Sequence, residues 1–226
     1  MPRASPLLAP LVPLAALVLA ACTGEEPSGP RPAAGALVAA AAAGDADEVR
    51  RLLDAGADPD ETDADGRTAV THAAYGGHAD LVRLLIDAGA DIDRQDATRA
   101  NPLLSTGETG DVAVLEEVLR AHPDLTRTNR FGGTALIPAA DRGHVATVRR
   151  LLETDIDVDH VNDLGWTALL EAVILGDGGA AHVEIVRALV DAGADVSIPD
   201  GEGVTALEHA RAAGYDEMVA ILTAAG

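Results

Sequence analysis

The stretch TAVTHAAYGGHADLVRLLIDAGADID, residues Thr68–Asp93, decides the fold. It contains two short apolar segments separated by a Gly-Gly pair, and the leading threonine can cap a helix in the first segment. In the second segment Leu81, Leu84 and Leu85 recur with the spacing of one helix face. The stretch therefore predicts a short capped helix followed by a second helix with one buried face.

The same pattern recurs along the chain. Related segments begin at Asn101, Thr134, Thr167 and Thr205, at intervals of 33 residues except for a last interval of 38. The same frame extends back to Gly35, so six units account for residues 35–226. Because one such unit cannot bury its own apolar face, the units are expected to stack on each other.

Two of these units carry the most complete pattern. DADGRTAVTHAA (63–74) precedes LVRLLIDAGAD (81–91), and NDLGWTALLEA (162–172) precedes IVRALVDAGAD (185–195). These motifs resemble the ankyrin repeat, which runs D-x-x-G-x-T-P-L-H-x-A-A, then G-H, V-x-x-L-L and G-A-D. The resemblance implies an all-α repeat solenoid of about six stacked ankyrin repeats. Each repeat would be a helix-turn-helix with a β-turn or hairpin loop.

The sequence departs from the family pattern at the histidine of T-P-L-H. Five units carry another residue there: Thr71, Leu104, Ile137, Leu170 and Glu208. The hydrogen bonds that this histidine supports in the family are therefore expected to be absent or rebuilt. The first and last units are also irregular, as expected for units that cap a stack.

Composition restricts the function. Aromatic residues make up only 2% of the chain, so Ala, Leu and Val must form thin, closely packed helical layers. The 16 basic residues are all arginine and face 37 Asp and Glu, which gives a net charge of −21. This charge repels phosphate backbones, so no nucleic-acid partner is expected. The absence of lysine excludes P-loop and Schiff-base chemistry.

The first 34 residues predict export and anchoring. Residues 1–21 have a basic start, an apolar run interrupted by prolines and small residues at the end, as in a signal peptide. Leu19-Ala20-Ala21-Cys22 resembles the bacterial lipobox, which implies lipidation of Cys22, the only cysteine, and attachment to a membrane. Residues 22–34 are rich in Pro, Gly and Glu and are expected to form a flexible tether. The predicted location is the bacterial cell envelope, outside the cytoplasm.

Neither a catalytic nor a metal site is predicted. The acidic turn at residues 61–66 begins like a calcium loop but has His72 where the bidentate glutamate belongs. His78, His144 and His182 recur once per unit, and stacked helices lie too far apart for these histidines to share one metal ion. No hydrolase or metalloprotease motif is present, so we expect a non-enzyme without a cofactor.

Units four and five carry the candidate partner-binding surface. The only Phe and the only Trp of the chain lie in the turns beside the first helices of these units, and about five extra residues separate the helices of unit five. Family members typically contact partners on the concave side, at turns and first-helix ends. The proposed contact residues are Phe131, Arg142, Trp166, Leu175 and Asp177. The partner is an unidentified protein, and the chain is expected to be a monomer.

Two other interpretations remain open. A small molecule or divalent cation could bind around the insertion, at Trp166, Glu171, Asp177 and His182. The second helices also align four arginines in a ladder, which is either an anion-binding stripe or, more simply, an exposed helix face: Arg50, Arg83, Arg149 and Arg187.

Overall fold

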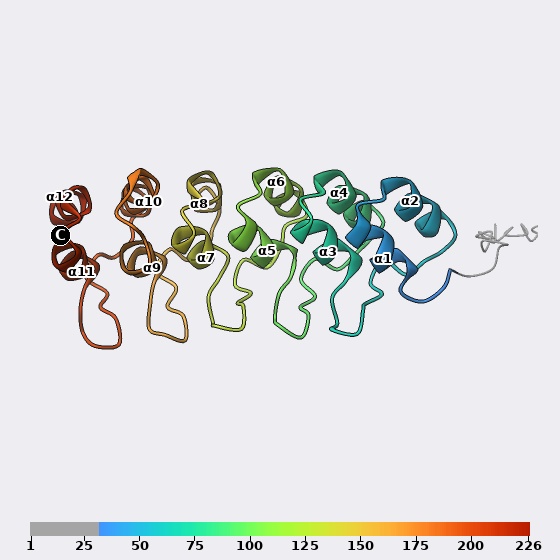
Figure 1. Cartoon of the computed structure of the whole chain (residues 1–226), viewed down its shortest axis with the longest axis horizontal. Coiled ribbons are helices and arrows are strands. Elements are labelled where there is room, and N and C mark those ends of the chain that lie inside the picture. The colour runs from blue at the N-terminus through green and yellow to red at the C-terminus, as the bar shows by residue number, and fades with distance from the viewer. Residues whose placement is uncertain (1–31) are drawn as a thin grey trace, which may run out of the picture.

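The chain forms an elongated array of helix pairs (Figure 1). The computed structural model describes residues 32–226, and these residues fold into six successive pairs, called units one to six below. The helices are α1 (Ala36–Ala43), α2 (Ala46–Asp54), α3 (Ala69–Tyr75), α4 (Ala79–Asp87), α5 (Pro102–Thr109), α6 (Val112–Arg120), α7 (Leu136–Asp141), α8 (Val145–Leu152), α9 (Ala168–Ile174), α10 (Ala180–Asp191), α11 (Ala206–Ala213) and α12 (Asp216–Ala225). The all-α repeat solenoid predicted from the sequence is confirmed.

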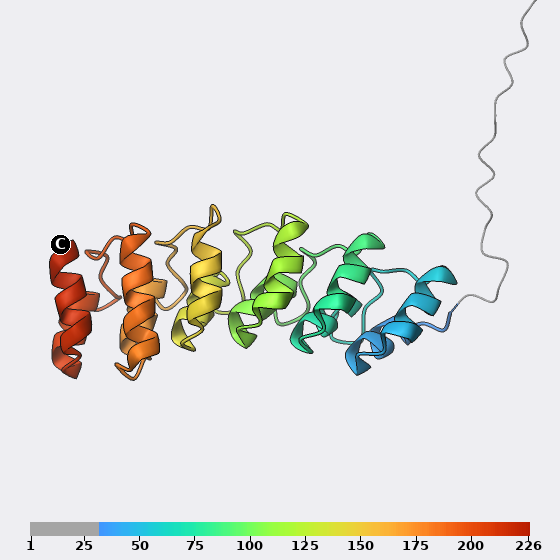
Figure 2. The ribbon, with the colours of Figure 1, turned by 90° about the horizontal axis from the view of Figure 1, so that it is seen from above.

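The helices form two rows. The odd-numbered helices pack successively against one another, as do the even-numbered helices, and each unit contacts mainly its neighbours. Long hairpin loops project from one edge of the array (Figure 1), and the rows curve gently along their length (Figure 2). In the described part of the chain these hairpins contain two isolated bridges, Thr62–Thr68 and Pro199–Thr205, and no extended strand.

Small residues allow the first helices to approach closely. Ala73, Ala74, Ala139 and Ala140 are all fully buried between units. The leucines and valines of the second helices complete one continuous apolar cluster through the array. A core built this way needs few aromatic residues, as the composition predicted.

The predicted helix caps are present in most units. Thr68, Thr167 and Thr205 accept hydrogen bonds from the backbone N–H three residues later, at 3.2 to 3.4 Å, and Asn101 does so at 2.8 Å. Thr134 is the exception, because α7 begins at Leu136 and the buried Thr134 hydroxyl has no hydrogen-bond partner among the described residues. The expectation of a threonine cap is therefore wrong in unit four.

The insertion in unit five has a structural role. It lengthens α10 to 12 residues, against 9 in α4 and 8 in α8, and forms a turn at residues 175–179. The hydroxyl of Tyr215 in unit six donates a hydrogen bond to the Gly176 carbonyl at 3.1 Å. Asp177 accepts hydrogen bonds from the Gly179 N–H at 2.8 Å and pairs with His182 at 3.0 Å. These contacts hold the turn against the neighbouring unit.

The predicted signal peptide (1–21), the lipidated Cys22 and most of the predicted tether (22–34) lie outside the described residues. Within residues 32–226, no helix has the length and apolar character needed to cross a membrane.

Candidate functional site

The hairpins of units four and five hold two apolar side chains outward. Asn129 accepts hydrogen bonds from the N–H groups of Phe131 and Gly133, at 2.9 and 3.0 Å. In the next hairpin, Asn162 accepts hydrogen bonds from the N–H groups of Leu164 and Trp166, both at 3.0 Å. The two hairpin turns leave the Phe131 side chain 52% exposed and the Leu164 side chain 57% exposed, although both are large apolar residues.

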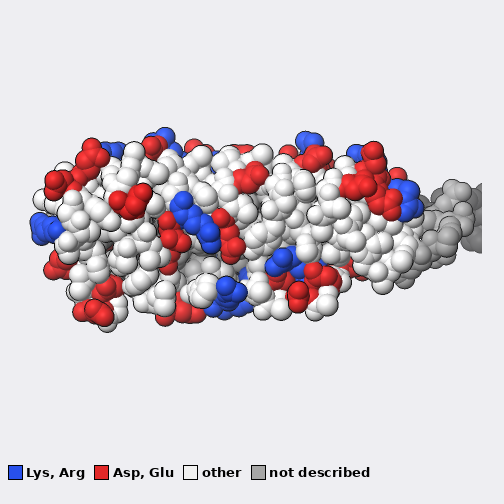
Figure 3. All heavy atoms as spheres, in the orientation of Figure 1, with Lys and Arg blue, Asp and Glu red and all other residues white. Residues whose placement is uncertain are grey.

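These two side chains border a groove of about 220 Å³ between the hairpins and the first helices. We call this hollow the interaction groove. Its lining includes three exposed apolar residues, Phe131, Leu164 and Leu175. It also includes the basic Arg142 and the acidic Glu108, Asp141 and Glu171. On the middle of the face seen in Figure 3, basic and acidic side chains lie next to each other. The groove therefore combines an apolar rim with charged walls, which is typical of protein-binding surfaces.

The structure brings together three of the five residues predicted to bind a partner. Phe131, Arg142 and Leu175 all line the interaction groove, and Leu175 is 50% exposed. Trp166 is half-buried and packs against the apolar core, and it does not line the groove. Asp177 is exposed in the turn that it stabilises and does not line the groove.

Sequence reasoning missed Leu164. Three positions before the first residue of each unit, the hairpin tip carries Asp65, Thr98, Phe131, Leu164 and Glu202 in turn. Polar residues are usual at such a tip because it faces solvent. Apolar residues at this position in two successive hairpins were a signal that could have identified Leu164 as a candidate surface residue.

Glu171 of α9 lies at the base of the groove. It is only 7% exposed, and its Oε1 accepts a hydrogen bond from Nδ2 of Asn162 at 2.7 Å. Burial, reinforced by the nearby charge of Asp141, raises the pKa of Glu171 to about 7, although the Asn162 hydrogen bond opposes the shift. At neutral pH this carboxyl group is therefore divided between its protonated and ionised forms.

This raised pKa predicts a pH-dependent effect on stability. A carboxyl group that is more basic in the folded state than in the unfolded state disfavours folding as pH rises from about 4.5 to about 7. Glu171→Gln keeps an oxygen for Asn162 and removes the charge. We expect it to be about 2 kcal/mol more stable than the wild type at about pH 8, with little difference at about pH 4.5. Urea denaturation across this range measures the difference, and a difference that did not vary with pH would refute the assignment.

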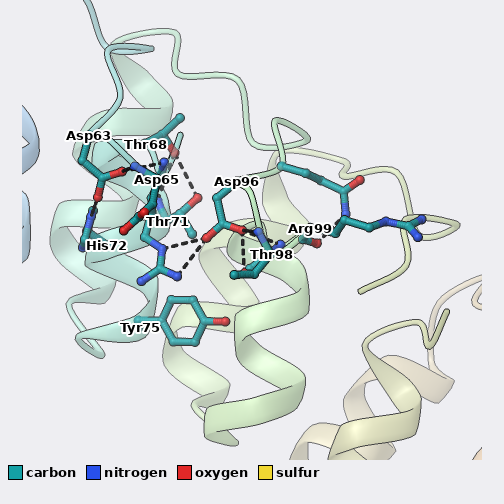
Figure 4. A network of polar contacts seen from close by, with 12 residues as sticks. Asp63, Asp65, Thr68, Thr71, His72, Tyr75, Asp96, Thr98 and Arg99 are labelled. Atoms are coloured by element: carbon teal, nitrogen blue, oxygen red, sulfur yellow. Dashed lines mark hydrogen bonds and ion pairs between the residues drawn. The ribbon is translucent and has the colours of Figure 1, made fainter. Parts of the chain in front are cut away.

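A second hollow adjoins the interaction groove and shares Glu108, Asn129 and Phe131 with it. Here the Tyr75 hydroxyl donates a hydrogen bond to Glu108 at 3.1 Å, and the guanidinium of Arg67 lies over the Tyr75 ring at 4.9 Å. Arg67 also pairs with the buried Asp96 at 2.8 Å. Figure 4 shows Tyr75, Thr98 and Asp96 together in this network. The face thus continues from unit five toward unit two.

At the position of the missing family histidine, the Thr71 hydroxyl contacts the Thr68 hydroxyl at 2.9 Å, and histidines one residue later make other contacts. His72 Nε2 pairs with Asp63 at 2.7 Å and His209 Nε2 pairs with Asp200 at 2.7 Å, each linking a first helix to its own hairpin. Glu171 and Asn162 make the corresponding contact in unit five. These three contacts each join the first helix of a unit to its own hairpin.

The alternative ligand residues do not form one cluster around the insertion. Asp177 and His182 contact each other, Glu171 faces the interaction groove, and Trp166 packs against the core. Within residues 32–226, no group of three or more His, Cys, Asp or Glu is arranged to hold a metal ion.

Two of the three repeated histidines contact a backbone carbonyl. Nε2 of His144 contacts the Glu108 carbonyl at 3.2 Å and that of His182 contacts the Asp141 carbonyl at 2.9 Å, each in the preceding unit. His78 and His144 immediately precede their helices, and His182 lies in the first turn of α10, so all three are at helix starts, as expected.

Three arginines of the ladder pair with acidic side chains: Arg50 with Asp47 at 3.3 Å, Arg83 with Glu117 at 3.6 Å and Arg149 with Glu184 at 2.8 Å. These pairs favour the exposed-face interpretation over an anion-binding stripe.

Stacked helix pairs with projecting hairpins define an all-α repeat solenoid. Family models described as ankyrin repeats match residues 103–200 (three copies) and 37–86 (many copies). The chain belongs to the ankyrin-repeat family.

Known proteins agree with this assignment. The structure of an ankyrin repeat domain (ABAYE2397) from Acinetobacter baumannii AYE is 43% identical, with a TM-score of 0.82 over 85% of this chain and 98% of that one. The ankyrin repeat protein EF0377 is 40% identical, with a TM-score of 0.82 over the same shares of the two chains. The ankyrin repeat protein YahD of Escherichia coli (strain K12) is 44% identical over 56 residues, which are 25% of this chain and 28% of that protein.

Proposed function

We propose that this chain is a non-catalytic, exported and lipid-anchored module that binds a protein partner through the interaction groove of units four and five. Ankyrin repeats generally mediate protein–protein interactions, and proteins built from them are typically not enzymes. The observation that carries the choice of surface is the grouping of three exposed apolar residues, Phe131, Leu164 and Leu175, around one groove. Large apolar side chains at a desolvated centre with arginine nearby are the usual energetic anchors of an interface.

Capture of the partner tests this surface. We expect the double variant Phe131→Ser and Leu175→Ser to lose at least about tenfold in capture of a partner from native envelope extracts, because both rim anchors are removed. Both side chains are half exposed, so the melting temperature should change little.

Val161→Ser is the control, because Val161 is 45% exposed in the hairpin that also carries Leu164 and does not line the groove. Equal loss of capture in the control and the double variant would exclude the groove as the binding surface.

The anchor rests on the sequence pattern at Leu19–Cys22. We expect mass spectrometry of the mature N-terminus to find an acylated Cys22. A free thiol after Ala21, or an intact Met1, would contradict lipid anchoring. Export of an acidic, flexibly tethered array would place the interaction groove at a membrane surface outside the cytoplasm.

A further inference from the structure

The charges of the interaction groove indicate the chemistry of its partner. Three successive first helices contribute a carboxylate to the lining: Glu108 from α5, Asp141 from α7 and Glu171 from α9. Arg142 is the one cationic residue among the lining groups. An acidic segment entering this groove would meet all three carboxylates, whereas a basic side chain would be attracted by them.

The surroundings of Glu171 give a further indication. Its side chain lies at the base of the groove and is only 7% exposed, and among the described residues only Asn162 donates a hydrogen bond to it, at Oε1. The second carboxylate oxygen has no donor from the described residues. This oxygen is not among the fully buried unpaired atoms, so it is open to the groove, where a donor supplied by a partner can reach it.

The groove has room for a side chain, since its volume is about 220 Å³, and the second hollow of about 300 Å³ continues it along the same face. The apolar rim extends on both sides of the acidic base, since Phe131 and Leu164 belong to the hairpins and Leu175 follows α9. A chain passing along the groove would therefore meet apolar, acidic and apolar contacts in turn.

We propose that the interaction groove binds an extended segment of the partner protein in which one arginine or lysine is flanked by apolar residues. The cation donates hydrogen bonds to Glu171 and is attracted by Asp141 and Glu108. The flanking apolar residues cover Phe131, Leu164 and Leu175. This inference rests on the proposed function and specifies the class of partner.

Binding of a cation should be coupled to ionisation of Glu171. The pKa of about 7 means that about a tenth of the Glu171 side chains are ionised at about pH 6 and about nine tenths at about pH 8. Arginine and lysine stay protonated over this range. Affinity for a basic segment should therefore rise about tenfold from pH 6 to pH 8.

The other charged groups facing this site are Asp141, Glu108 and Arg142. On the adjacent α11, His209 is paired with Asp200.

Peptide pools with a fixed central residue test the inference. The probes are nine-residue pools with degenerate flanks and a central Arg, Lys, norleucine or Glu, passed over the immobilised chain at about pH 6 and pH 8. We expect the Arg and Lys pools to be retained at least about tenfold better than the norleucine and Glu pools, and more strongly at pH 8.

Glu171→Gln should remove both the preference and the pH dependence, and Asp141→Asn should weaken the preference. Glu217→Gln removes the same charge from an exposed position of α12 and should change neither the preference nor the pH dependence. Because His209 is unchanged in Glu171→Gln, a pH dependence that persists in this variant would overturn the role of Glu171. A melting curve for each variant verifies folding, and Gln can keep the contact with Asn162.

Two further outcomes overturn the inference. If no pool is retained, or if the norleucine pool is retained as well as the Arg pool, the groove does not select a basic side chain. If the norleucine and Arg pools were retained equally and Phe131→Ser abolished this retention, the groove would still be an interaction surface. Only its preference for a cation would be refuted. Failure of the proposed function would instead appear as unchanged partner capture by the rim variants.

Discussion

Replacing Asp96 with alanine is expected to lower the free energy of unfolding by about 3–5 kcal/mol. The Asp96 side chain is 1% exposed and accepts hydrogen bonds from the N–H groups of Thr98 and Ala100, at 2.8 and 2.9 Å. It also accepts from the Thr98 hydroxyl at 2.7 Å and from Nε of Arg67 at 2.9 Å. Alanine would leave the Ala100 N–H buried and the Arg67 guanidinium partly buried without this acceptor, whereas the exposed Thr98 can turn to water.

The ionisation of Asp96 agrees with this role. Burial raises its pKa, but the hydrogen bonds from Thr98, Ala100 and Arg67 outweigh burial, so the pKa lies below its usual value. An acid with a lowered pKa in the folded state stabilises the fold above its unfolded-state pKa, and this contribution is lost as pH falls through the folded-state pKa. The deficit of Asp96→Ala should therefore shrink in acid.

Asp65→Ala is the control, because Asp65 is an exposed residue of the preceding hairpin and its loss removes the same charge. We expect it to change stability by less than about 0.5 kcal/mol in urea denaturation at neutral pH. If Asp96→Ala and Asp65→Ala had similar stabilities, the buried network would not be important for the hairpin.

The second large effect is expected at Gly107 in α5. A Cβ atom built on Gly107 would lie 2.2 Å from the Ala135 carbonyl oxygen and 3.0 Å from Cγ of Pro138. Because the nearest atom belongs to the backbone of the next unit, α5 and α7 would have to separate. Alanine is a better helix former than glycine by about 1 kcal/mol, but overpacking should outweigh this gain and leave a net loss of about 2–3 kcal/mol.

Gly201→Ala provides the comparison, since its Cβ would meet nothing closer than the Leu164 carbonyl oxygen at 3.9 Å and its φ is not positive. It should be nearly neutral by thermal or urea unfolding. Wild-type stability in Gly107→Ala would show that the two units can separate without cost, contrary to the close packing in this structure.

The sequence predicted the architecture well because the repeat multiplies a weak local signal. One segment such as Thr68–Asp93 is ambiguous, but five aligned copies fix the frame, the caps and the buried stripe together. The missing cap at Thr134 was not predictable, since its residue type matches the other units and only the start of α7 at Leu136 differs.

The site was predicted only in part, for a physical reason. Phe131, Arg142 and Leu175 could be placed on one surface because they occupy repeat positions that face the same way. The directions of Trp166 and Asp177 depend on packing against the core and on the local turn of the insertion, which the frame does not describe. The burial of Glu171 likewise depends on its contacts with Asn162 and the groove, not on its position in the repeat.

The central claim is that the interaction groove of units four and five contacts a protein partner, and site-specific photocrosslinking in the native cell tests it most directly. A photoreactive residue would replace Phe131 or Leu175 in the groove, and Val161 or Arg187 outside it. We predict that the two groove positions crosslink to the same protein and that the two outer positions do not. Crosslinks from positions 161 and 187 with none from positions 131 and 175 would contradict the claim.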